Sequence, residues 1–225
     1  MDLFKGILEV FLDTLYPNRC VGCGEIIGED DAFCDYCFEM LSKTSGDNRC
    51  KVCGSRKKDC LCRYRVFHFT SATAPYYNEG VAKKAMWDFK FRRKIQFADI
   101  FARQMALTVK TDFYGVNFDA VVYVPMPLKN TLKRGYNQSE VLGRILSKKL
   151  QIPLTTNVVK RIINNPPQIQ SKNRWENVRD IFALKRKKGL ENKHVLIIDD
   201  VITTSATTNY FVKTLRKIPN LKLSF

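Results

Sequence analysis

The clearest pattern along the chain is a run of four apolar residues, Val195-Leu196-Ile197-Ile198, which ends abruptly at Asp199-Asp200. A strand buried on both faces of a parallel sheet has this composition, whereas a half-exposed strand alternates apolar and polar residues. A second run, Asp119 to Val124 (DAVVYV), is closed by Pro125-Met126-Pro127, which fixes an extended exit from the sheet. The two runs predict two central strands.

Before, between and after these strands the apolar residues recur at the spacing of a helix that buries one face. Helices are predicted over residues 79–91 and 97–109, from about Ser139 to Leu150, and from about Ala206 to Lys217. Shorter β-prone stretches predict one or two strands within 66–77, another near Val158-Val159, and an edge or next-to-edge strand at Ser224-Phe225. Alternating strands and helices indicate an α/β fold in which helices cover a mostly parallel sheet.

Residues 1–17 predict a separate amphipathic helix, which Pro17 closes. Its charge is not basic, so we expect its apolar face to pack on the neighbouring domain and not on a membrane. No apolar run approaches the roughly 20 residues that span a bilayer, and the N-terminus lacks the pattern of a secretion signal. These features predict a cytoplasmic protein without a membrane span.

Charge divides the 225 residues into two unequal parts, although the whole carries a net charge of +16. Residues 1–62 hold 8 Lys and Arg against 11 Asp and Glu, whereas residues 63–225 hold 30 against 11. Such asymmetry is typical of a basic domain that faces a polyanion or an anionic ligand. A cationic surface that only keeps the protein soluble explains the counts equally well.

All eight cysteines lie within the acidic part, in three Cys-x2-Cys pairs followed by Cys60-x-Cys62. Paired knuckles of this kind favour tetrahedral zinc over a disulfide framework, and a site filled by cysteine leaves no position for a catalytic water. We therefore predict one or two structural zinc ions in a module of residues 18–62. The favoured grouping is Cys20, Cys23, Cys34 and Cys37 for one ion and Cys50, Cys53, Cys60 and Cys62 for another. A cross-braced pairing, or one ion with spare thiols, stays open.

The segment after the apolar run 195–198 carries the candidate chemistry of the basic part. Asp199 and Asp200 are followed by a hydroxyl-rich loop and then by a predicted helix. Hydroxyls and backbone N–H groups at a helix N-terminus favour phosphate, and two carboxylates can accept hydrogen bonds from sugar hydroxyls or hold hydrated Mg²⁺. The alternative is that the acids only solvate a strand end and the hydroxyls cap the helix.

This segment resembles the ribose-phosphate-binding motif of type I phosphoribosyltransferases, which use phosphoribosyl pyrophosphate (PRPP) with Mg²⁺. The resemblance implies that Asp199 and Asp200, the candidate catalytic residues, contact the ribose hydroxyls. It also implies that the following loop wraps the 5′-phosphate of PRPP or a related phosphosugar; its residues are Thr203, Thr204, Ser205, Ala206 and Thr207. Ser205 departs from the family, which usually has Gly there.

Four motifs in order, VPMP, KRGYNQS, QIQSKNRWENV and IDDVITTSAT, follow the cysteine-rich part. In this order they resemble the ComF family of ComFC-type competence proteins. The resemblance implies a phosphoribosyltransferase-like domain over residues 63–225 behind the zinc module. It further implies a cytoplasmic role in natural transformation, with single-stranded DNA and a helicase-like competence protein as partners.

The stretch after Pro127, which contains the KRGYNQS motif, is expected to be a loop after a strand end, where arginine and backbone N–H groups can clamp a pyrophosphate. Lys133, Arg134, Gln138 and Ser139 are the candidates there, and the family pattern places Arg174 on a flap over the same crevice. Tyr136 and Trp175 either stack on a base or pack their loops. We expect DNA phosphates to meet basic residues of the predicted helix 79–91 and the turn after it: Lys83, Lys84, Arg92, Arg93 and Lys94.

Two functions are compatible with these features. The favoured one is a DNA-uptake accessory protein that binds single-stranded DNA and is built on a PRPP-binding fold. The alternative is an active, Mg²⁺-dependent phosphoribosyltransferase of nucleotide metabolism. The sequence names no general base and no acceptor. A purely structural adaptor would leave the acidic pair without a role.

Overall fold

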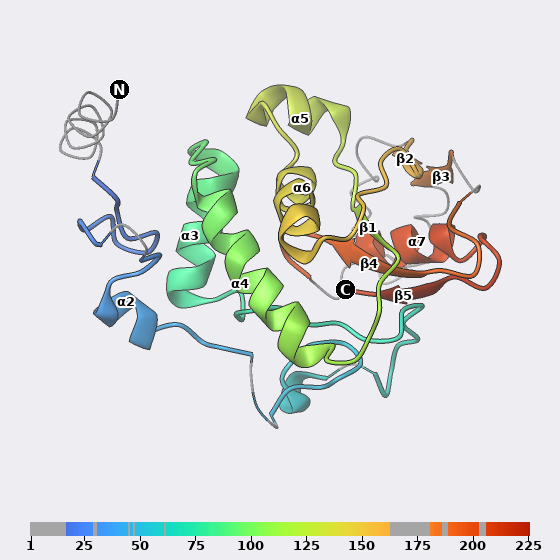
Figure 1. The fold of residues 1–225 in the computed structure, drawn as a ribbon, viewed down its shortest axis with the longest axis horizontal. Helices are drawn as coiled ribbons and strands as arrows, with labels where there is room; N and C mark the ends of the chain where they lie inside the picture. The colour runs from blue at the N-terminus through green and yellow to red at the C-terminus, as the bar shows by residue number, and fades with distance from the viewer. Residues whose placement is uncertain are drawn as a thin grey trace, which may run out of the picture.

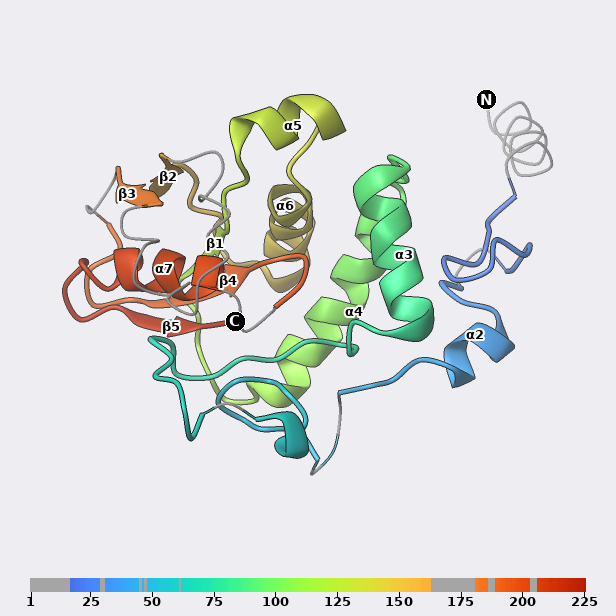
Figure 2. The same cartoon turned by 180° about the vertical axis from the view of Figure 1, so that it is seen from behind.

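The computed structural model describes residues 17–28, 31–44, 46, 48–60, 62–162, 181–185, 189–202 and 206–225. The predicted helix of residues 1–17 falls almost wholly outside this range, as do Thr203, Thr204, Ser205, Arg174 and Trp175. The structure has a parallel sheet flanked by helices and an N-terminal cysteine-rich part (Figures 1 and 2). This is the predicted α/β architecture of a phosphoribosyltransferase-like domain.

Three parallel strands form the centre of the sheet, in the order β1 (Ala120–Tyr123), β4 (His194–Ile198) and β5 (Lys222–Ser224). Val195 is paired with Ala120 on one side and with Leu223 on the other. Single parallel bridges extend the sheet at both edges, where Leu154 pairs with Val121 and Ser71 with Ser224. β4 is thus the middle strand, as its uninterrupted apolar sequence predicts.

Successive residues of β4 contribute to two different cores, because side chains alternate between the faces of a strand. Val195 and Ile197 belong to one core, which contains Phe211 of α7 (Ala206–Leu215). A two-stranded antiparallel ribbon, β2 (Val159–Arg161) with β3 (Phe182–Leu184), packs on the same side.

Leu196 and Ile198 belong to the other core, which three helices cover (Figure 1). These helices are α3 (Gly80–Phe91), α4 (Phe97–Asp112) and α6 (Gln138–Leu150). Leu142 and Leu146 of α6 are buried directly against this face of the sheet. Residues of the cysteine-rich part, among them Val21 and Phe33, share the same core.

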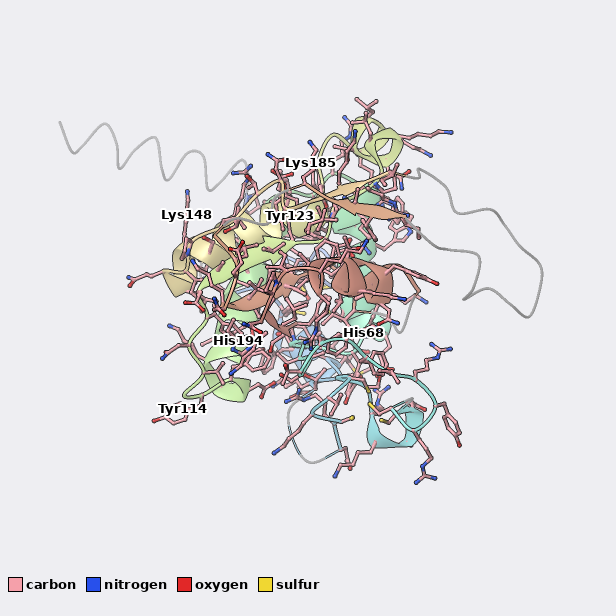
Figure 3. All side chains as sticks on the ribbon, turned by 90° about the vertical axis from the view of Figure 1, so that its right-hand side faces the viewer. His68, Tyr114, Tyr123, Lys148, Lys185 and His194 are labelled. Atoms are coloured by element: carbon pink, nitrogen blue, oxygen red, sulfur yellow. The ribbon has the colours of Figure 1, made fainter. Side chains whose placement is uncertain are left out.

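The beginning of β4 is fixed by polar contacts at the edge of both cores. The backbone N–H of His194 donates to Asp119 Oδ2 at 2.8 Å, and His194 Nε2 lies 3.0 Å from Ser224 Oγ. Figure 3 shows His194 at this end of the sheet, near the end of α4 from which Tyr114 projects. The opposite end of β4 is therefore the end that carries Asp199 and Asp200.

Within its described residues the structure corrects two expectations and adds one element. Residues 66–77 form no strand and pair only through isolated bridges at Ser71 and Tyr76. The stretch expected as a loop after Pro127 contains the short helix α5 (Leu128–Arg134), which ends at Gly135 with φ of 87°. β3 was not predicted, since three residues are too few for a periodic signal.

Two further elements belong to the cysteine-rich part, the short helix α2 (Asp35–Glu39) and the 3-10 turn η1 (Lys57–Asp59). The division into residues 1–17, 18–62 and 63–225 stays a prediction. Among the described residues, no helix combines the length and the apolar character that a membrane crossing needs.

The packing of β4 makes a stability prediction. Leu196→Ala removes a side chain with 0% exposure from the centre of the helix-covered core, and we expect the free energy of unfolding to fall by about 2–5 kcal/mol. Leu107→Ala on α4 is the matched control, because Leu107 is 58% exposed and its truncation should change stability by about 0.5 kcal/mol at most. Urea unfolding measures both, and equal midpoints would contradict the assigned core.

Candidate functional site

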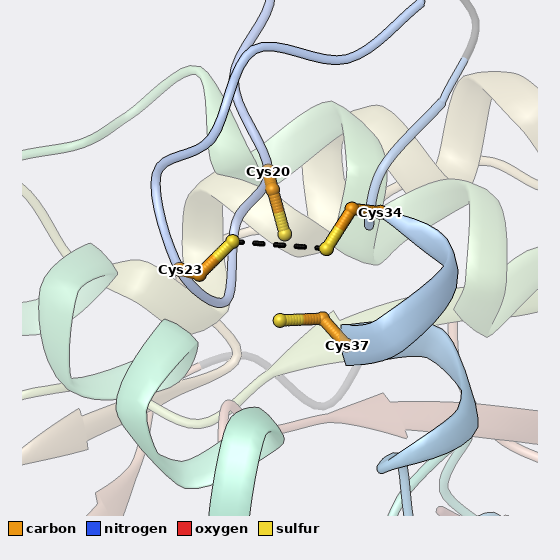
Figure 4. A group of neighbouring side chains, drawn as sticks. All are labelled: Cys20, Cys23, Cys34 and Cys37. Atoms are coloured by element: carbon orange, nitrogen blue, oxygen red, sulfur yellow. Dashed lines mark hydrogen bonds between the residues drawn. The ribbon is translucent and has the colours of Figure 1, made fainter.

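Two groups of four cysteines form compact clusters. In the first, the sulfurs of Cys20, Cys23, Cys34 and Cys37 all lie within 4.8 Å of one another (Figure 4). In the second, the same limit holds for Cys50, Cys53, Cys60 and Cys62. These are the two groups that the favoured sequence interpretation predicts, and they are not cross-braced.

The sulfur separations fit tetrahedral zinc. Cys23 and Cys34 are 3.7 Å apart, as are Cys50 and Cys62, and Cys53 and Cys60. Zinc–sulfur bonds of about 2.3 Å at tetrahedral angles place two sulfurs about 3.8 Å apart. A disulfide requires about 2.05 Å, so none of the eight thiols is bonded to another. The donor set supports structural zinc at both clusters.

Backbone N–H groups of the knuckles favour the thiolate form that a metal needs. Burial acts against ionisation of Cys20, but N–H groups of Cys23, Cys34 and Gly22 outweigh it and lower the pKa of Cys20 to about 6. The pKa of Cys50 is likewise lowered to about 6, against burial, by N–H groups of Cys53 and Val52. One thiol in each cluster is thus ready to ionise at neutral pH.

The first cluster is held directly against α3. Cys20 and Cys37 are buried in the same core as Ala85 and Phe89 of that helix. A Cβ atom added at Gly22 would stand 2.6 Å from Val81 Cγ1, so the knuckle requires glycine at this contact.

The second cluster is fastened to the rest of the chain by arginines. Arg49, next to Cys50, forms an ion pair with Asp112 at the end of α4 (2.8 Å) and donates from Nη1 to the carbonyl of Ala72 at 3.1 Å. Arg56 pairs with Glu79, the residue before α3. The cysteine-rich part is therefore anchored at the start of α3 and at the end of α4.

A separate cavity of about 200 Å³ opens at the carboxyl ends of β1 and β4. Ligands of open parallel sheets bind at this edge. The polar side chains around the cavity come from five different parts of the chain: Lys90, Arg134, Asn137, Ser139, Arg161, Asp199, Asp200 and Thr208. Three cations thus surround two carboxylates.

Asp199 is held from both sides at the end of β4. Ser139 Oγ, in the first turn of α6, donates to Asp199 Oδ1 at 2.8 Å, and the N–H of Asp200 donates to the same oxygen at 2.9 Å. Burial, followed by the charge of Asp200, raises the pKa of Asp199 to about 7 despite these donors and Lys90. The site therefore contains a carboxyl that changes charge near neutral pH.

Asp200 is paired with Lys90, whose Nζ lies 3.0 Å from Oδ2. Lys90 belongs to the last turn of α3, so this ion pair connects the helix to the end of β4. Across the cavity, Arg161 of β2 is half-buried; burial lowers its pKa while the charge of Asp199 acts against this. The cavity offers carboxylates to hydroxyls and cations to phosphates.

The structure brings some of the predicted binding residues together and separates others. Asp199, Asp200, Arg134 and Ser139 line the cavity. Gln138 does not, because it is fully buried and its Oε1 accepts from Arg134 Nη1 at 3.3 Å; it orients the arginine. Lys133 is exposed and lies outside the cavity lining.

The remaining predicted residues are only partly placed. Ala206 and Thr207 begin α7, just ahead of Thr208 in the cavity lining. Arg174 and the loop residues 203–205 lie outside the described range. Tyr136 packs against Phe89 and donates its hydroxyl to that residue's carbonyl, so packing, not stacking on a base, explains this ring.

Four residues of the cavity were missed by sequence reasoning. Lys90 resembles the other basic residues around the 79–91 helix, and Arg161 is set in a three-residue strand. Asn137 caps α6 by accepting from the N–H of Ser139, a role that the motif does not distinguish from ligand binding. Thr208 follows directly after the predicted phosphate loop 203–207, and its hydroxyl could have identified it as a further phosphate-binding residue.

Comparisons with known proteins identify a family for the cysteine-rich part and several relatives of the chain. Residues 11–64 match the double zinc ribbon domain family. The chain is 33% identical over 136 residues to "Competence protein F" of Haemophilus influenzae, covering 58% of the chain and 59% of that protein. It is 24% identical over 202 residues to "Competence protein ComFC" of Bacillus subtilis, covering 84% and 80%.

A third relative is "DNA utilization protein YhgH" of Escherichia coli, with 29% identity over 123 residues that cover 52% of this chain and 53% of that protein. The alignments thus span little more than half the length of the Haemophilus and Escherichia proteins.

The clusters predict the zinc content and its structural effect. We expect two zinc ions per chain, and we expect Cys20→Ser and Cys50→Ser each to lose one, because tetrahedral thiolate sites require all four ligands. Cys20→Ser should also speed hydrogen exchange in α3, since the first cluster shares the core of that helix. Elemental analysis and exchange mass spectrometry measure these effects. Unchanged zinc content in both variants would contradict the assignment.

The environment of Asp199 predicts a pH-dependent stability difference. Its pKa rises from an ordinary 3.8 to about 7 on folding, so protonation stabilises the fold fully below pH 3.8 and this contribution is lost as the pH approaches 7. Asp199→Asn does not ionise and keeps an acceptor for Ser139. Its Tm should exceed that of the wild type by a few degrees at pH 8, and the gap should close toward pH 4. A gap independent of pH would refute this.

Proposed function

The chain belongs to the ComF family, and on this premise we propose that it acts in DNA uptake, binding single-stranded DNA and a phosphoribosyl ligand at neighbouring surfaces. The names of its relatives, two competence proteins and a DNA utilization protein, support the first part. The observation that supports the second is the acidic pair at the end of β4, set opposite Lys90, Arg134 and Arg161.

Each part of a phosphoribosyl ligand has a group that suits it. The Asp199 and Asp200 carboxylates accept from the ribose hydroxyls, and Arg134 and Arg161 are positioned for phosphate oxygens. The start of α7 adds backbone N–H groups, and Thr208 a hydroxyl, for the 5′-phosphate. PRPP has this combination of hydroxyls and phosphates.

Magnesium fits this donor set as a companion of the ligand. Ser139 and the backbone contact only Asp199 Oδ1, and Lys90 contacts Asp200 Oδ2, so each carboxylate has a second oxygen to offer. Mg²⁺ commonly combines one or two carboxylates with substrate phosphates and water. Bound there, it would neutralise the charge of a pyrophosphate group. Asp199 and Asp200 are the residues of this chain that would hold it.

The basic surface supports the nucleic-acid part of the proposal. Residues 63–225 carry 30 Lys and Arg against 11 acids, and a phosphate backbone binds such a surface largely by releasing counterions. We place this activity in the cytoplasm, where reduced thiols persist and where a helicase-like competence protein would supply the strand. Zinc keeps the cysteine-rich part folded and takes no part in binding.

A second candidate is an active phosphoribosyltransferase. The observation in its favour is that Asp199, within the cavity, changes protonation near pH 7, which suits a group that exchanges protons with a substrate. Release of pyrophosphate from PRPP in the presence of an acceptor base would establish turnover. Saturable binding without release would leave the binding function alone.

The ligand site predicts the behaviour of a double variant. Asp199→Asn with Asp200→Asn should weaken PRPP binding beyond detection, because the carboxylates bind the ribose, and should leave two zinc ions. The double variant should not weaken single-stranded DNA binding, because it removes only negative charge. Calorimetric titration, elemental analysis and fluorescence anisotropy measure the three properties. Unchanged PRPP affinity would show that the acidic pair does not bind the ribose.

Single-stranded DNA binding predicts a steep dependence on salt. The logarithm of the affinity for a labelled oligo(dT) should fall linearly with the logarithm of salt concentration, with a slope of about −0.7 per phosphate neutralised. Duplex DNA and heparin should compete less well than unlabelled single strands. If heparin competes equally, the basic surface is a general polyanion binder and the DNA-uptake proposal loses its support.

A further inference from the structure

Two large aromatic side chains stand exposed on the last turns of α3. Trp87 is 48% and Phe91 52% exposed, and their spacing of four residues puts them on one face of the helix. The ring centroids are 5.5 Å apart with 43° between the planes. The two neighbouring rings therefore form a small exposed aromatic patch, which marks a candidate interaction site.

Each ring is accompanied by an arginine. The guanidinium carbon of Arg92 lies 5.2 Å from the Trp87 ring centroid, and that of Arg134 lies 4.7 Å from the Phe91 ring centroid. We call these four residues the α3 stacking surface. Because guanidinium groups border both rings, an apolar partner would have to desolvate two charges, whereas a polyanion would neutralise them.

The neighbouring acid does not oppose an anionic partner. Asp88 is 1% exposed, and its carboxylate is paired with Lys94 Nζ at 3.2 Å and with Arg92 Nε at 3.5 Å. Its charge is therefore compensated beneath the surface, while Arg93 in the following turn is exposed. Anions approaching the two rings meet a net positive surface.

The α3 stacking surface adjoins the phosphoribosyl cavity. Arg134 contacts Phe91 and also lines the cavity. Lys90, the residue before Phe91, pairs with Asp200 inside that cavity. A nucleotide stacked on Phe91 would thus have its phosphate close to cations that already face the cavity.

We propose that bases of single-stranded DNA stack on Trp87 and Phe91 while Arg92, Arg93 and Arg134 neutralise the adjoining phosphates. The proposal rests on the proposed function and gives the DNA a specific place. Exposed aromatic rings interleaved with cations suit single strands, whose bases present free faces. A duplex keeps its bases stacked on one another, so it has no free base faces for the two rings.

This placement revises the basic patch expected from the sequence. Lys84 donates to the carbonyl of Gly22 and Lys94 pairs with Asp88, so both support the fold and are unsuitable for substitution. Tyr136, a candidate stacking ring, is packed on Phe89. Trp87 and Phe91 were assigned no role from the sequence.

The test uses Trp87→Ala and Phe91→Ala, made singly and together, and Tyr114→Ala as the control. Tyr114 is 89% exposed and projects beyond the far end of α4 (Figure 3), so its loss controls for a missing aromatic ring. Fluorescence anisotropy is measured with oligo(dT) and with an abasic strand of equal length. For oligo(dT), each removed α3 ring should cost about fivefold or more in affinity, and Tyr114→Ala should have no effect.

The abasic strand separates stacking from a general loss of binding. Wild-type protein should prefer oligo(dT) over the abasic strand, and the double variant should bind both equally, with an unchanged salt slope because no charge is removed. Equal affinities of wild type and double variant for oligo(dT) would overturn the stacking surface while leaving DNA binding intact. No binding of DNA by the wild type would instead overturn the proposed function.

Tryptophan fluorescence provides a direct readout that does not depend on variants at the surface. The chain has two tryptophans, so Trp175→Phe leaves Trp87 as the sole reporter. Oligo(dT) should quench its emission and the abasic strand should not, since quenching requires a stacked base. Emission that both strands change equally, or neither, would contradict the proposal.

Discussion

β4 has apolar neighbours on both faces, so Asp199 and Asp200 leave the sheet at the point where both cores end. The strand contributes Val195 and Ile197 to one core and Leu196 and Ile198 to the other. Neither the position nor the direction of its carboxyl end can shift without exposing one of these sets. A buried carboxyl is unfavourable, as the raised pKa of Asp199 reflects. Ser139, backbone and Lys90 offset part of this cost.

α3 connects the two chemically distinct parts of the molecule. Its inward face shares a core with Cys20 and Cys37 of the first cluster, and its last turns present Lys90 to Asp200 and Phe91 to Arg134. The thiolates fix a knuckle too small to have a core of its own. In this arrangement zinc contributes indirectly, by holding the helix that carries cavity and surface residues.

How much the sequence predicts depends on how local the physical signal is. Period-3.6 patterns located α3, α4 and α6, and an uninterrupted apolar run located β4, because each signal is complete within its own segment. The cysteine grouping followed from knuckle spacing in the same way. Asp199 and Asp200 were predicted from a motif; both line the cavity at the end of β4, and their role in ligand binding stays a prediction.

Local sequence patterns could not predict contacts between distant segments. Lys90 precedes Asp200 by more than a hundred residues, and nothing local distinguishes it from Lys83. Gln138 resembled a ligand-binding residue because its motif is polar, yet it is buried and orients Arg134. α5 was taken for a loop because seven residues are too few to show a helical period. The sequence assigned no role to Trp87 and Phe91, and their exposure becomes visible only once α3 is packed.

The central claim is that the carboxyl end of β4 recognises a phosphorylated ribose. Calorimetric titration with a series of related ligands tests it most directly. The wild-type protein is titrated, with Mg²⁺ present, with PRPP, ribose 5-phosphate and inorganic pyrophosphate. Binding through both the acidic pair and the cations predicts that PRPP binds most tightly, that ribose 5-phosphate binds more weakly but measurably, and that only these two lose affinity in Asp199→Asn. If pyrophosphate binds as well as PRPP and Asp199→Asn changes neither, the cavity binds anions without recognising the sugar, which contradicts the claim.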